Sequence, residues 1–277
     1  MGRMPSRVHP SIVAAVVLLF LALPGTAGAA ETLPPELAGV EIANKLGAML
    51  PAESELTSYT GAPVRLATLL APGKPLVLTL NYYECPMLCS LQLNGLVAGL
   101  RNLGLTPGVD FELVTVSIDP REGTQLAAAK RQAYLRELRL PGAEWHFMVG
   151  RPAEIDRLAA AVGFGYRYDE KTDQFAHPPA VFFFAPSGRL ARVLSGLTYE
   201  TRDLRFALME ASEGRIGTAV DLVLLSCFHY DATRGRYGPT AMGIMRLACV
   251  VSTIIIAVVL LTLWRRERAR RSPEIAP

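Results

Sequence analysis

The sequence predicts an α/β protein with a mixed β-sheet flanked by helices. Short, β-prone apolar runs alternate with longer segments in which apolar residues recur at helical spacing, as in a sheet covered by helices. The apolar runs 180–185 and 190–194 are joined by the tight turn Pro186-Ser187-Gly188-Arg189, which indicates a hairpin. Antiparallel strands there make the predicted sheet mixed rather than wholly parallel.

The expected elements follow a regular order along the chain. An N-terminal hairpin is expected over residues 56–66, around Gly61-Ala62-Pro63. The predicted strands after it are 76–80, 111–118, 145–149, 180–185 and 190–194. The predicted helices run from Pro86 to a glycine cap at Gly104, from Thr124 as a cap to Leu138, over 153–162 after Pro152, and over 202–213.

Two cysteines lie at the turn between strand 76–80 and its helix. Pro86 suits the first helical position, so Cys85 is expected to cap the helix and Cys89 to lie one turn later. Their Cβ atoms would then be about 5–6 Å apart, wider than the roughly 3.5–4.5 Å of a disulfide. A metal ion about 2.3 Å from each sulfur tolerates that spacing better. The helix N-terminus also favours the thiolate, which binds metals and attacks disulfides.

A third ligand is expected, because two thiolates alone rarely complete a metal site. Of the four histidines, His9 falls in the leader, His146 is expected to be structural in a strand of buried type, and His229 lies close to the predicted anchor. His177 remains, in a proline-stiffened loop just before strand 180–185. The alternative is a surface histidine with no ligand role.

The donor set selects among metals. Two soft thiolates and one imidazole suit Cu(I) and also accept Cu(II). A structural zinc site needs a fourth ligand, and Cys227 or His229 would have to fold back onto the other three ligands to supply it. The Cys227-x-His229 pair is otherwise expected to be an interfacial segment leading into the anchor.

The two ends of the chain predict export and membrane attachment. Residues 1–30 have two arginines, an apolar run and a small-residue cleavage site, as in a secretory signal peptide. A transmembrane helix is expected over 241–264, because 247–264 is an uncharged apolar run. Five arginines in the tail 265–277 indicate a cytoplasmic C-terminus.

Between these ends, the sequence predicts one main domain outside the cytoplasm. A lead-in segment (31–54), of which residues 31–51 are expected to pack loosely over the surface, precedes that domain (55–214), and a juxtamembrane segment (215–240) follows it. The chain is thus expected in the cytoplasmic (inner) membrane, with the main domain on the periplasmic side. From Ala30 to Met245 there are 20 Lys and Arg against 23 Asp and Glu. Nothing in this balance suggests nucleic acid as a partner.

Four features in order resemble the Sco/SenC family of copper-binding assembly factors for cytochrome c oxidase. They are Tyr83-Glu84-Cys85-Pro86-Met87-Leu88-Cys89, Val116-Ser117-Ile118-Asp119-Pro120-Arg121, Trp145-His146-Phe147, and His177 before an apolar strand. The resemblance implies a thioredoxin-like fold and copper held by Cys85, Cys89 and His177. It also implies a metallochaperone that receives copper from a donor protein and loads the binuclear copper centre of oxidase subunit II.

The sequence departs from this family in three places. Ser90 follows the second cysteine where many relatives have proline, and two prolines follow His177. The predicted anchor is C-terminal, whereas that of many relatives is N-terminal. Asp119-Pro120 is expected to be a strand-end turn rather than a catalytic acid.

The alternative from another functional class is a membrane-anchored thiol–disulfide oxidoreductase, with Cys85 and Cys89 as its catalytic pair. It acts on the cysteines of the copper centre or on other exported proteins, and does not need His177. Three residues separate these cysteines, whereas thioredoxin-like redox motifs have two, which counts against it.

Overall fold

The computed structural model describes residues 39–70, 73–85 and 88–213, together with the short pieces 228–231, 236–239, 248, 251–252, 254–256, 258–259 and 262. The predicted signal peptide, most of the juxtamembrane segment, most of the predicted transmembrane helix and the basic tail lie outside the described residues. The predictions for those segments therefore remain predictions.

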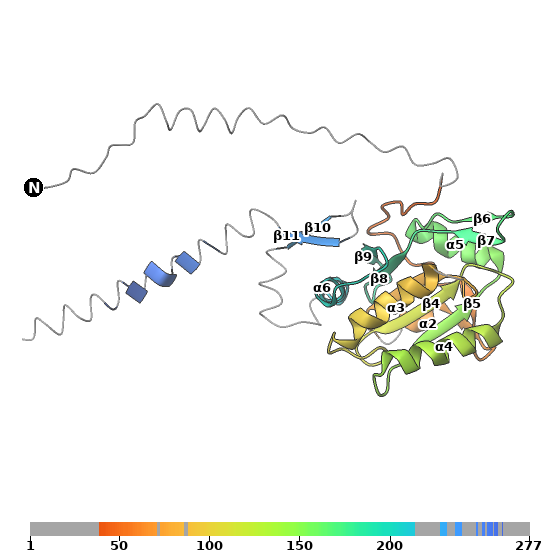
Figure 1. The fold of residues 1–277 in the computed structure, drawn as a ribbon, viewed down its shortest axis with the longest axis horizontal. Coiled ribbons are helices and arrows are strands. Elements are labelled where there is room, and N and C mark those ends of the chain that lie inside the picture. Colours follow the sequence, from red (N-terminus) through yellow and green to blue (C-terminus); the bar gives the residue numbers. More distant parts are fainter. Residues whose placement is uncertain are drawn as a thin grey trace, which may run out of the picture. The chain divides into compact units, whose positions relative to one another are not determined.

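A seven-stranded mixed sheet runs through the main domain, in the order β2-β1-β5-β4-β3-β8-β9 (Figure 1). Its strands are β1 (Glu55–Ser58), β2 (Pro63–Arg65), β3 (Leu76–Asn81), β4 (Glu112–Ser117), β5 (His146–Val149), β8 (Ala180–Phe184) and β9 (Leu190–Ser195). β3, β4 and β5 are mutually parallel, and the remaining neighbours pair antiparallel. The predicted mixed sheet, the N-terminal hairpin and the 180–194 hairpin are confirmed.

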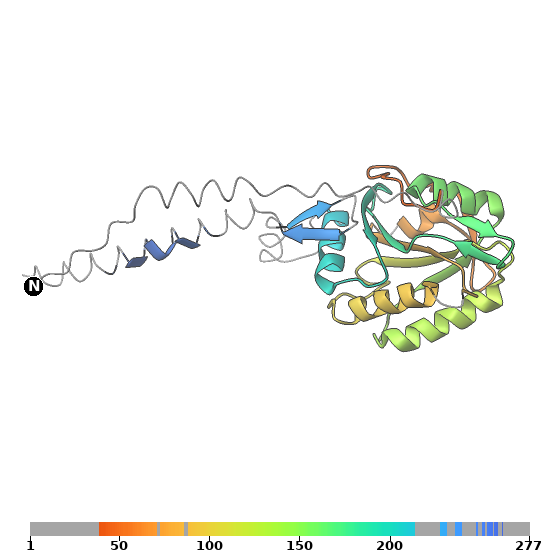
Figure 2. The same cartoon turned by 45° about the horizontal axis from the view of Figure 1, so that its top comes forward.

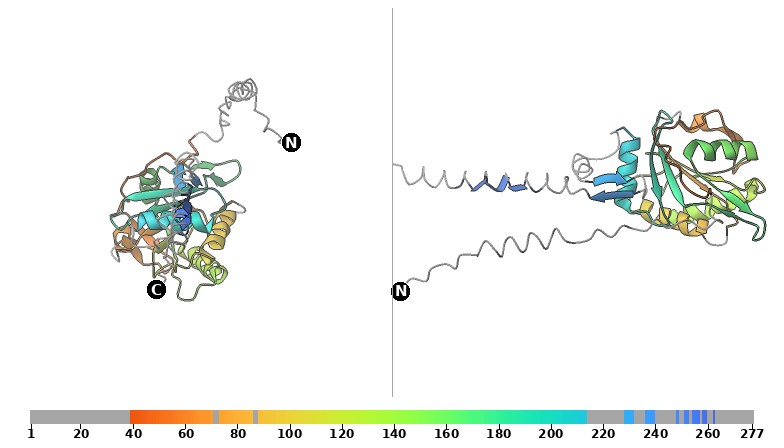
Figure 3. Two further views of the ribbon diagram at one scale, coloured as in Figure 1. Left: turned by 90° about the vertical axis from the view of Figure 1, so that its left-hand side faces the viewer. Right: turned by 90° about the horizontal axis from the view of Figure 1, so that it is seen from above.

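Helices cover both faces of this sheet. They are α2 (Leu66–Leu70), α3 (Leu88–Arg101), α4 (Thr124–Leu138), α5 (Pro152–Val162) and α6 (Thr201–Ala211). Figures 2 and 3 show α3 and α4 on one side of the strands and α5 on the other. Alternate residues of a strand point to opposite faces, so on β3 Val77 joins the core under α3 and α4, whereas Leu76 and Leu78 join the core under α5. Both β3 and β4 are buried along their whole length.

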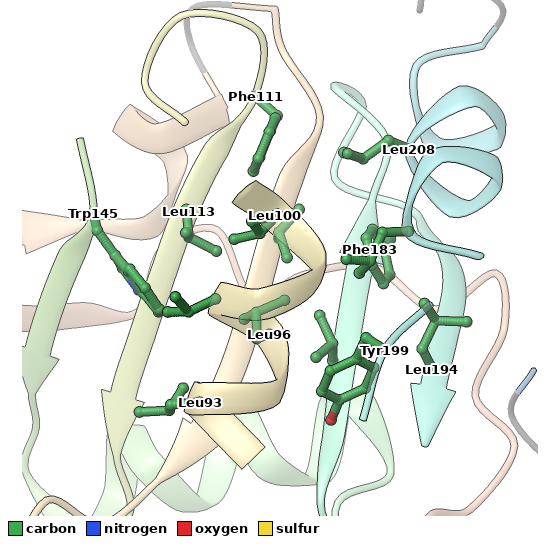
Figure 4. Close-up of a cluster of buried hydrophobic side chains, with 14 of the residues drawn as sticks. Leu93, Leu96, Leu100, Phe111, Leu113, Trp145, Phe183, Leu194, Tyr199 and Leu208 are labelled. Carbon is green, nitrogen blue, oxygen red and sulfur yellow. The ribbon is translucent and has the colours of Figure 1, made fainter. Parts of the chain in front are cut away.

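The helix that follows the first cysteine is held tightly against the sheet. Figure 4 shows Leu96 and Leu100 of α3 between Leu113 of β4 and Phe183 of β8, all of them buried. On its other side α3 meets the segment before α6, where a Cβ at Gly95 would lie 2.0 Å from the carbonyl oxygen of Leu197. Glycine at this position permits the close approach of the two backbones.

Two expectations about local structure were wrong. The N-cap of α4 is Gly123, and Thr124 is the first helical residue rather than the cap. The lead-in does not pack loosely over its described part, residues 39–54. Its backbone hydrogen-bonds at two separate places, Ala43 N to Gly163 O and Leu50 N to Gly188 O, both at 2.8 Å. Leu50 is buried, which ties this segment to the apolar core.

The sequence analysis missed two small hairpins and the helix α2. One hairpin pairs β6 (Arg167–Asp169) with β7 (Gln174–Ala176) in a two-stranded sheet of its own. The other pairs β10 (Phe228–Asp231) with β11 (Arg236–Pro239). The first of these ends immediately before His177, so its placement decides where that imidazole lies.

A search for membrane spans finds none among the described residues, where every helix is too short or too polar to cross a bilayer.

Substitution of Gly95 by alanine is expected to destabilise the chain, although alanine is the better helix former. The new methyl group would force α3 away from Leu197, and overpacking of this kind costs about 1–3 kcal/mol. Urea denaturation of the purified chain measures the effect. The neighbouring exposed position supplies the control, because Asn94→Ala should change the unfolding free energy by no more than about 0.5 kcal/mol. A Gly95→Ala variant as stable as Asn94→Ala would contradict the close packing.

Candidate metal centre

Cys85 lies in the short connection between β3 and α3, and the residues before it are held by buried hydrogen bonds. The backbone N–H groups of Tyr83 and Glu84 donate to the two carboxylate oxygens of Glu122, at 2.8 and 2.7 Å. The Tyr83 hydroxyl donates to Met148 O at 2.6 Å on β5, which is separated from β3 by β4. Only 8% of Cys85 is exposed. The segment leading into the thiol is therefore fixed on two sides.

Glu122 is a buried carboxylate with a structural task. Burial is the largest influence on its pKa and raises it, while hydrogen bonds from Ser117, Tyr83 and Glu84 act in the opposite direction. Because three donors surround its two oxygens, including Ser117 Oγ at 2.5 Å, the cost of removing it from water is partly offset.

Strand topology brings the loop of His177 to the same place. β8 runs antiparallel to β3, with Val181 opposite Thr79, so the residues just before β8 lie beside the end of β3. Two buried side-chain amides connect β3, α3 and β8. The Asn81 amide donates to Gln92 of α3, and the Gln92 amide donates to Ala180 O, both at 2.8 Å. The end of β3, the first half of α3 and the start of β8 are thereby held in one arrangement.

His177 is as buried as Cys85, with 8% exposed, and aromatic rings surround it. Its ring centroid lies 5.9 Å from that of Tyr82 and 5.7 Å from that of Phe164. Nδ1 lies 3.3 Å from Pro178 O. A carbonyl oxygen only accepts, so Nδ1 carries the proton and the lone pair of the neutral ring is on Nε2.

The segments of the two predicted ligands lie at the same edge of the sheet, although 92 residues separate Cys85 and His177 in the sequence. Burial lowers the pKa of His177, and the charge of the Cys85 sulfur opposes that shift. The sequence-based expectation that this loop approaches the cysteine turn agrees with this arrangement.

The other predicted thiolate, Cys89, belongs to the first turn of α3 by its backbone, and its side chain is outside the described part of the structure. Pro86 and Met87 also lie outside it, so the predicted capping by Cys85 stays a prediction. Among the side chains that are described, no three of Cys, His, Asp or Glu are grouped to hold a metal ion. The complete ligand set is therefore taken up as a proposal below.

The remaining candidates of the sequence analysis have simpler roles or cannot be placed. Asp119 is buried and accepts hydrogen bonds from the backbone and guanidinium of Arg121, as a strand-end turn requires. His146 is half-buried on β5, with Nε2 3.3 Å from Glu112 Oε2. His229 lies on β10 opposite Gly238. Cys227 lies outside the described residues.

Sequence reasoning overlooked Arg121, Glu122 and Asp173, which support both halves of this region. Glu122 holds the residues before Cys85, and Arg121 bonds to Asp173 at 2.7 Å in the hairpin before His177. The motif Asp119-Pro120-Arg121 is part of the family resemblance, and Asp119-Pro120 was expected to be a turn, but Arg121 was given no role. Its position at the end of β4, the parallel neighbour of β3, was the available signal, because the ends of parallel strands meet at one edge of a sheet.

Fold and site together define a thioredoxin-like protein with a buried thiol and a buried imidazole at the edge of its central strands. The family model SCO1/SenC matches residues 45–209, and the chain belongs to this family.

Solved structures agree with this fold. Two proteins from Aquifex aeolicus VF5 match with TM-scores of 0.55 and 0.51, at 24% and 25% identity, over 61% of this chain and 96% and 99% of theirs. A further similar structure is Arabidopsis thaliana ScoI with copper bound, with 20% identity, 61% and 98% coverage and a TM-score of 0.48. A comparison with curated protein sequences finds no match.

The buried imidazole predicts a pH dependence of stability. Because burial lowers the pKa of His177 below its ordinary value of 6.5, the unfolded chain binds a proton there more readily than the folded chain. The contribution of His177 to stability is present above that value and is lost as the pH falls below it. Urea denaturation of the metal-free chain at pH 7 and pH 5 should show a smaller loss for His177→Gln than for the wild type.

His146→Gln is the matched control, because it removes another imidazole of the same domain from a half-buried site. Equal losses in the wild type and in His177→Gln would show that the His177 ring is not held in the neutral form.

Proposed function

We propose that this chain is a copper-binding assembly factor that loads the binuclear copper centre of cytochrome c oxidase subunit II. Copper is its cargo, received from a donor protein and held by the thiolates of Cys85 and Cys89 and by His177. Membership of the SCO1/SenC family supports this role. The observation that carries it is the pairing of β3 with β8, which brings the buried segments of Cys85 and His177 to one edge of the sheet.

The chemistry of these donors fits copper. Cu(I) prefers thiolate and imidazole ligands. Two thiolates and one imidazole accommodate it without a fourth protein ligand. His177 has its lone pair on Nε2 when Nδ1 faces Pro178 O, the tautomer in which the ring binds a metal. Burial of Cys85 and His177 keeps water from competing for the cargo. Ligand exchange with the cysteines of a recipient then passes copper on without a change in its charge.

Attachment to the cytoplasmic membrane belongs to the same proposal. A single C-terminal helix over 241–264, with the basic tail in the cytoplasm, would tether the domain on the periplasmic side. Apolar side chains are exposed at the described helical positions within that segment, including Val251, Ile254, Ile255, Ile256, Val258 and Val259. Such exposure is unfavourable in water and favourable in lipid.

A thiol–disulfide oxidoreductase is the second candidate. The observation in its favour is the position of Cys89 in the first turn of α3, with Cys85 three residues before that helix, because a helix N-terminus stabilises the thiolate that attacks disulfides. This function needs both cysteines but not the imidazole. His177→Ala therefore separates the two candidates, because reductase activity survives it and high-affinity copper binding does not.

The purified chain is expected to bind about one Cu(I), as a three-ligand thiolate and imidazole site implies. Cys85→Ala and Cys89→Ala should abolish this binding. His177→Ala should weaken it by more than the roughly 10- to 100-fold that loss of a supporting contact costs at a metal site. Competition with a chromophoric Cu(I) chelator measures these affinities. His146→Ala is the control and should bind like the wild type; an unchanged affinity in His177→Ala would defeat the assignment of the imidazole.

Membrane attachment has a separate test. The full chain should sediment with membranes and resist extraction by alkaline carbonate, whereas a chain ending at residue 240 should be released, because it lacks the apolar span. A chain ending at residue 264 is the matched control, since it lacks only the basic tail and should stay in the membrane. Release of the full chain by carbonate would contradict a spanning anchor.

A further inference from the structure

The hairpin that carries His177 is not part of the main sheet. β6 and β7 pair only with each other among the described strands, so backbone hydrogen bonds do not extend the seven-stranded sheet into this hairpin. His177 follows β7 directly. The position of the imidazole therefore depends on β8, which begins three residues later, and on the side chains that attach the hairpin to the body of the domain.

Arg121 makes the central attachment. One side of its guanidinium is fixed by Asp119, with Nε and a terminal nitrogen 2.9 and 2.7 Å from the carboxylate oxygens. The other terminal nitrogen donates to Asp173 Oδ1 at 2.7 Å, at the turn of the hairpin. The guanidinium carbon Cζ lies over the rings of Tyr168 and Phe175, at 5.1 and 5.9 Å from their centroids.

Asp173 is shaped for this contact. It adopts a left-handed conformation with a φ of 52°, which aspartate tolerates better than most residues and which turns the chain from β6 into β7. The same Oδ1 accepts a hydrogen bond from the Tyr168 hydroxyl at 2.6 Å. The two bonds lower the pKa of Asp173, so the carboxylate is charged at neutral pH.

The loop that contains Arg121 also supports the cysteine. Its next residue, Glu122, accepts the backbone hydrogen bonds of Tyr83 and Glu84, immediately before Cys85. Two consecutive residues of one loop thus fix the thiol segment and the imidazole hairpin relative to each other. Phe175 also links the hairpin to the residues before Cys85, because its ring centroid lies 5.6 Å from that of Tyr82. Tyr82 in turn contacts the His177 ring.

We propose that Arg121 and Asp173 are positioning residues: their contact fixes the β6–β7 hairpin so that the His177 ring lies beside Cys85. Neither residue binds the cargo. Only the part of the proposal that concerns copper rests on the function proposed above, since the place of the ring can be measured without metal. A lysine at position 121 would keep the charge but lose the planar fork that binds two carboxylates at once.

The metal-free test follows the His177 ring by NMR. The full chain in detergent micelles is labelled with ¹³C-histidine, which gives few signals because there are four histidines, and the His177 signal is assigned with His177→Gln. Ring currents of Tyr82 and Phe164 displace this signal in the wild type. In Arg121→Ala and in Asp173→Asn it should shift toward its position in urea, with a smaller shift in Arg121→Lys.

Arg101→Ala is the matched control. Arg101 forms an ion pair of 2.6 Å with Glu137 between α3 and α4, with exposure comparable to that of Arg121 and Asp173, and it does not touch the hairpin. It should leave the His177 signal in place. The Arg101–Glu137 and Arg121–Asp173 pairs are exposed and add little to global stability, so the melting temperatures of Arg101→Ala and Asp173→Asn should stay close to the wild-type value. Arg121→Ala should melt at a lower temperature, because it also leaves the buried carboxylate of Asp119 without its guanidinium partner. If Arg121→Ala proves poorly folded, the Asp173→Asn variant decides.

The copper test is a double-mutant cycle. Arg121→Ala alone should weaken Cu(I) binding, and it should have no further effect in a His177→Ala background, because the imidazole is the group that it positions. Equal losses in both backgrounds, or an unmoved His177 signal in Arg121→Ala and Asp173→Asn, would overturn the proposal. Failure of the wild-type chain to bind copper would instead overturn the proposed function, and the NMR result would still decide the role of Arg121.

Discussion

The antiparallel pairing of β8 with β3 is the constraint on which the candidate site depends. β3 ends at Asn81 and delivers Cys85 four residues later, while β8 begins at Ala180 and leaves His177 three residues before it. Because Thr79 pairs with Val181, the outgoing end of one strand and the incoming end of the other meet at the same edge. Had β8 run parallel to β3, His177 would lie at the opposite edge. The direction of one strand thus decides whether thiol and imidazole can meet.

Burial determines which charge states of Cys85 and His177 are favoured. A thiol and an imidazole among aromatic rings lose the water that would stabilise their charged forms. The imidazole is accordingly favoured as the neutral ring, which is the form that binds soft metals. Most nearby polar groups bond within the protein, since Glu122 accepts three hydrogen bonds and Gln92 links Asn81 to Ala180. The exception in this network is Asn81 Oδ1, which is buried without a hydrogen-bond partner among the described residues.

Much of the fold was predictable because each central element has one dominant signal. β8 is a continuous apolar run, β3 and β4 are rich in Leu and Val, α5 opens on Pro152, and the turn at Gly188 has a positive φ that favours glycine. The pair Cys85 and His177 was also predictable, from residue types and from strand order. The β6–β7 hairpin was not, because its strands have three residues each and mix charged with aromatic side chains. Strands this short carry no clear period, and tertiary contacts to Arg121 and Tyr82 hold them in place.

The turn at Asp119-Pro120 shows how a correct interpretation can be incomplete. Asp119 does end a strand and fixes its own turn, as expected. The same carboxylate orients the guanidinium of Arg121, which extends outward to the hairpin, while Glu122 extends inward to the backbone before Cys85. Adjacent residues of an irregular loop can point in these opposite directions because no helical or strand period constrains them. A strand-end turn that contacts both segments is therefore well suited to set the separation between the backbone before Cys85 and the β6–β7 hairpin.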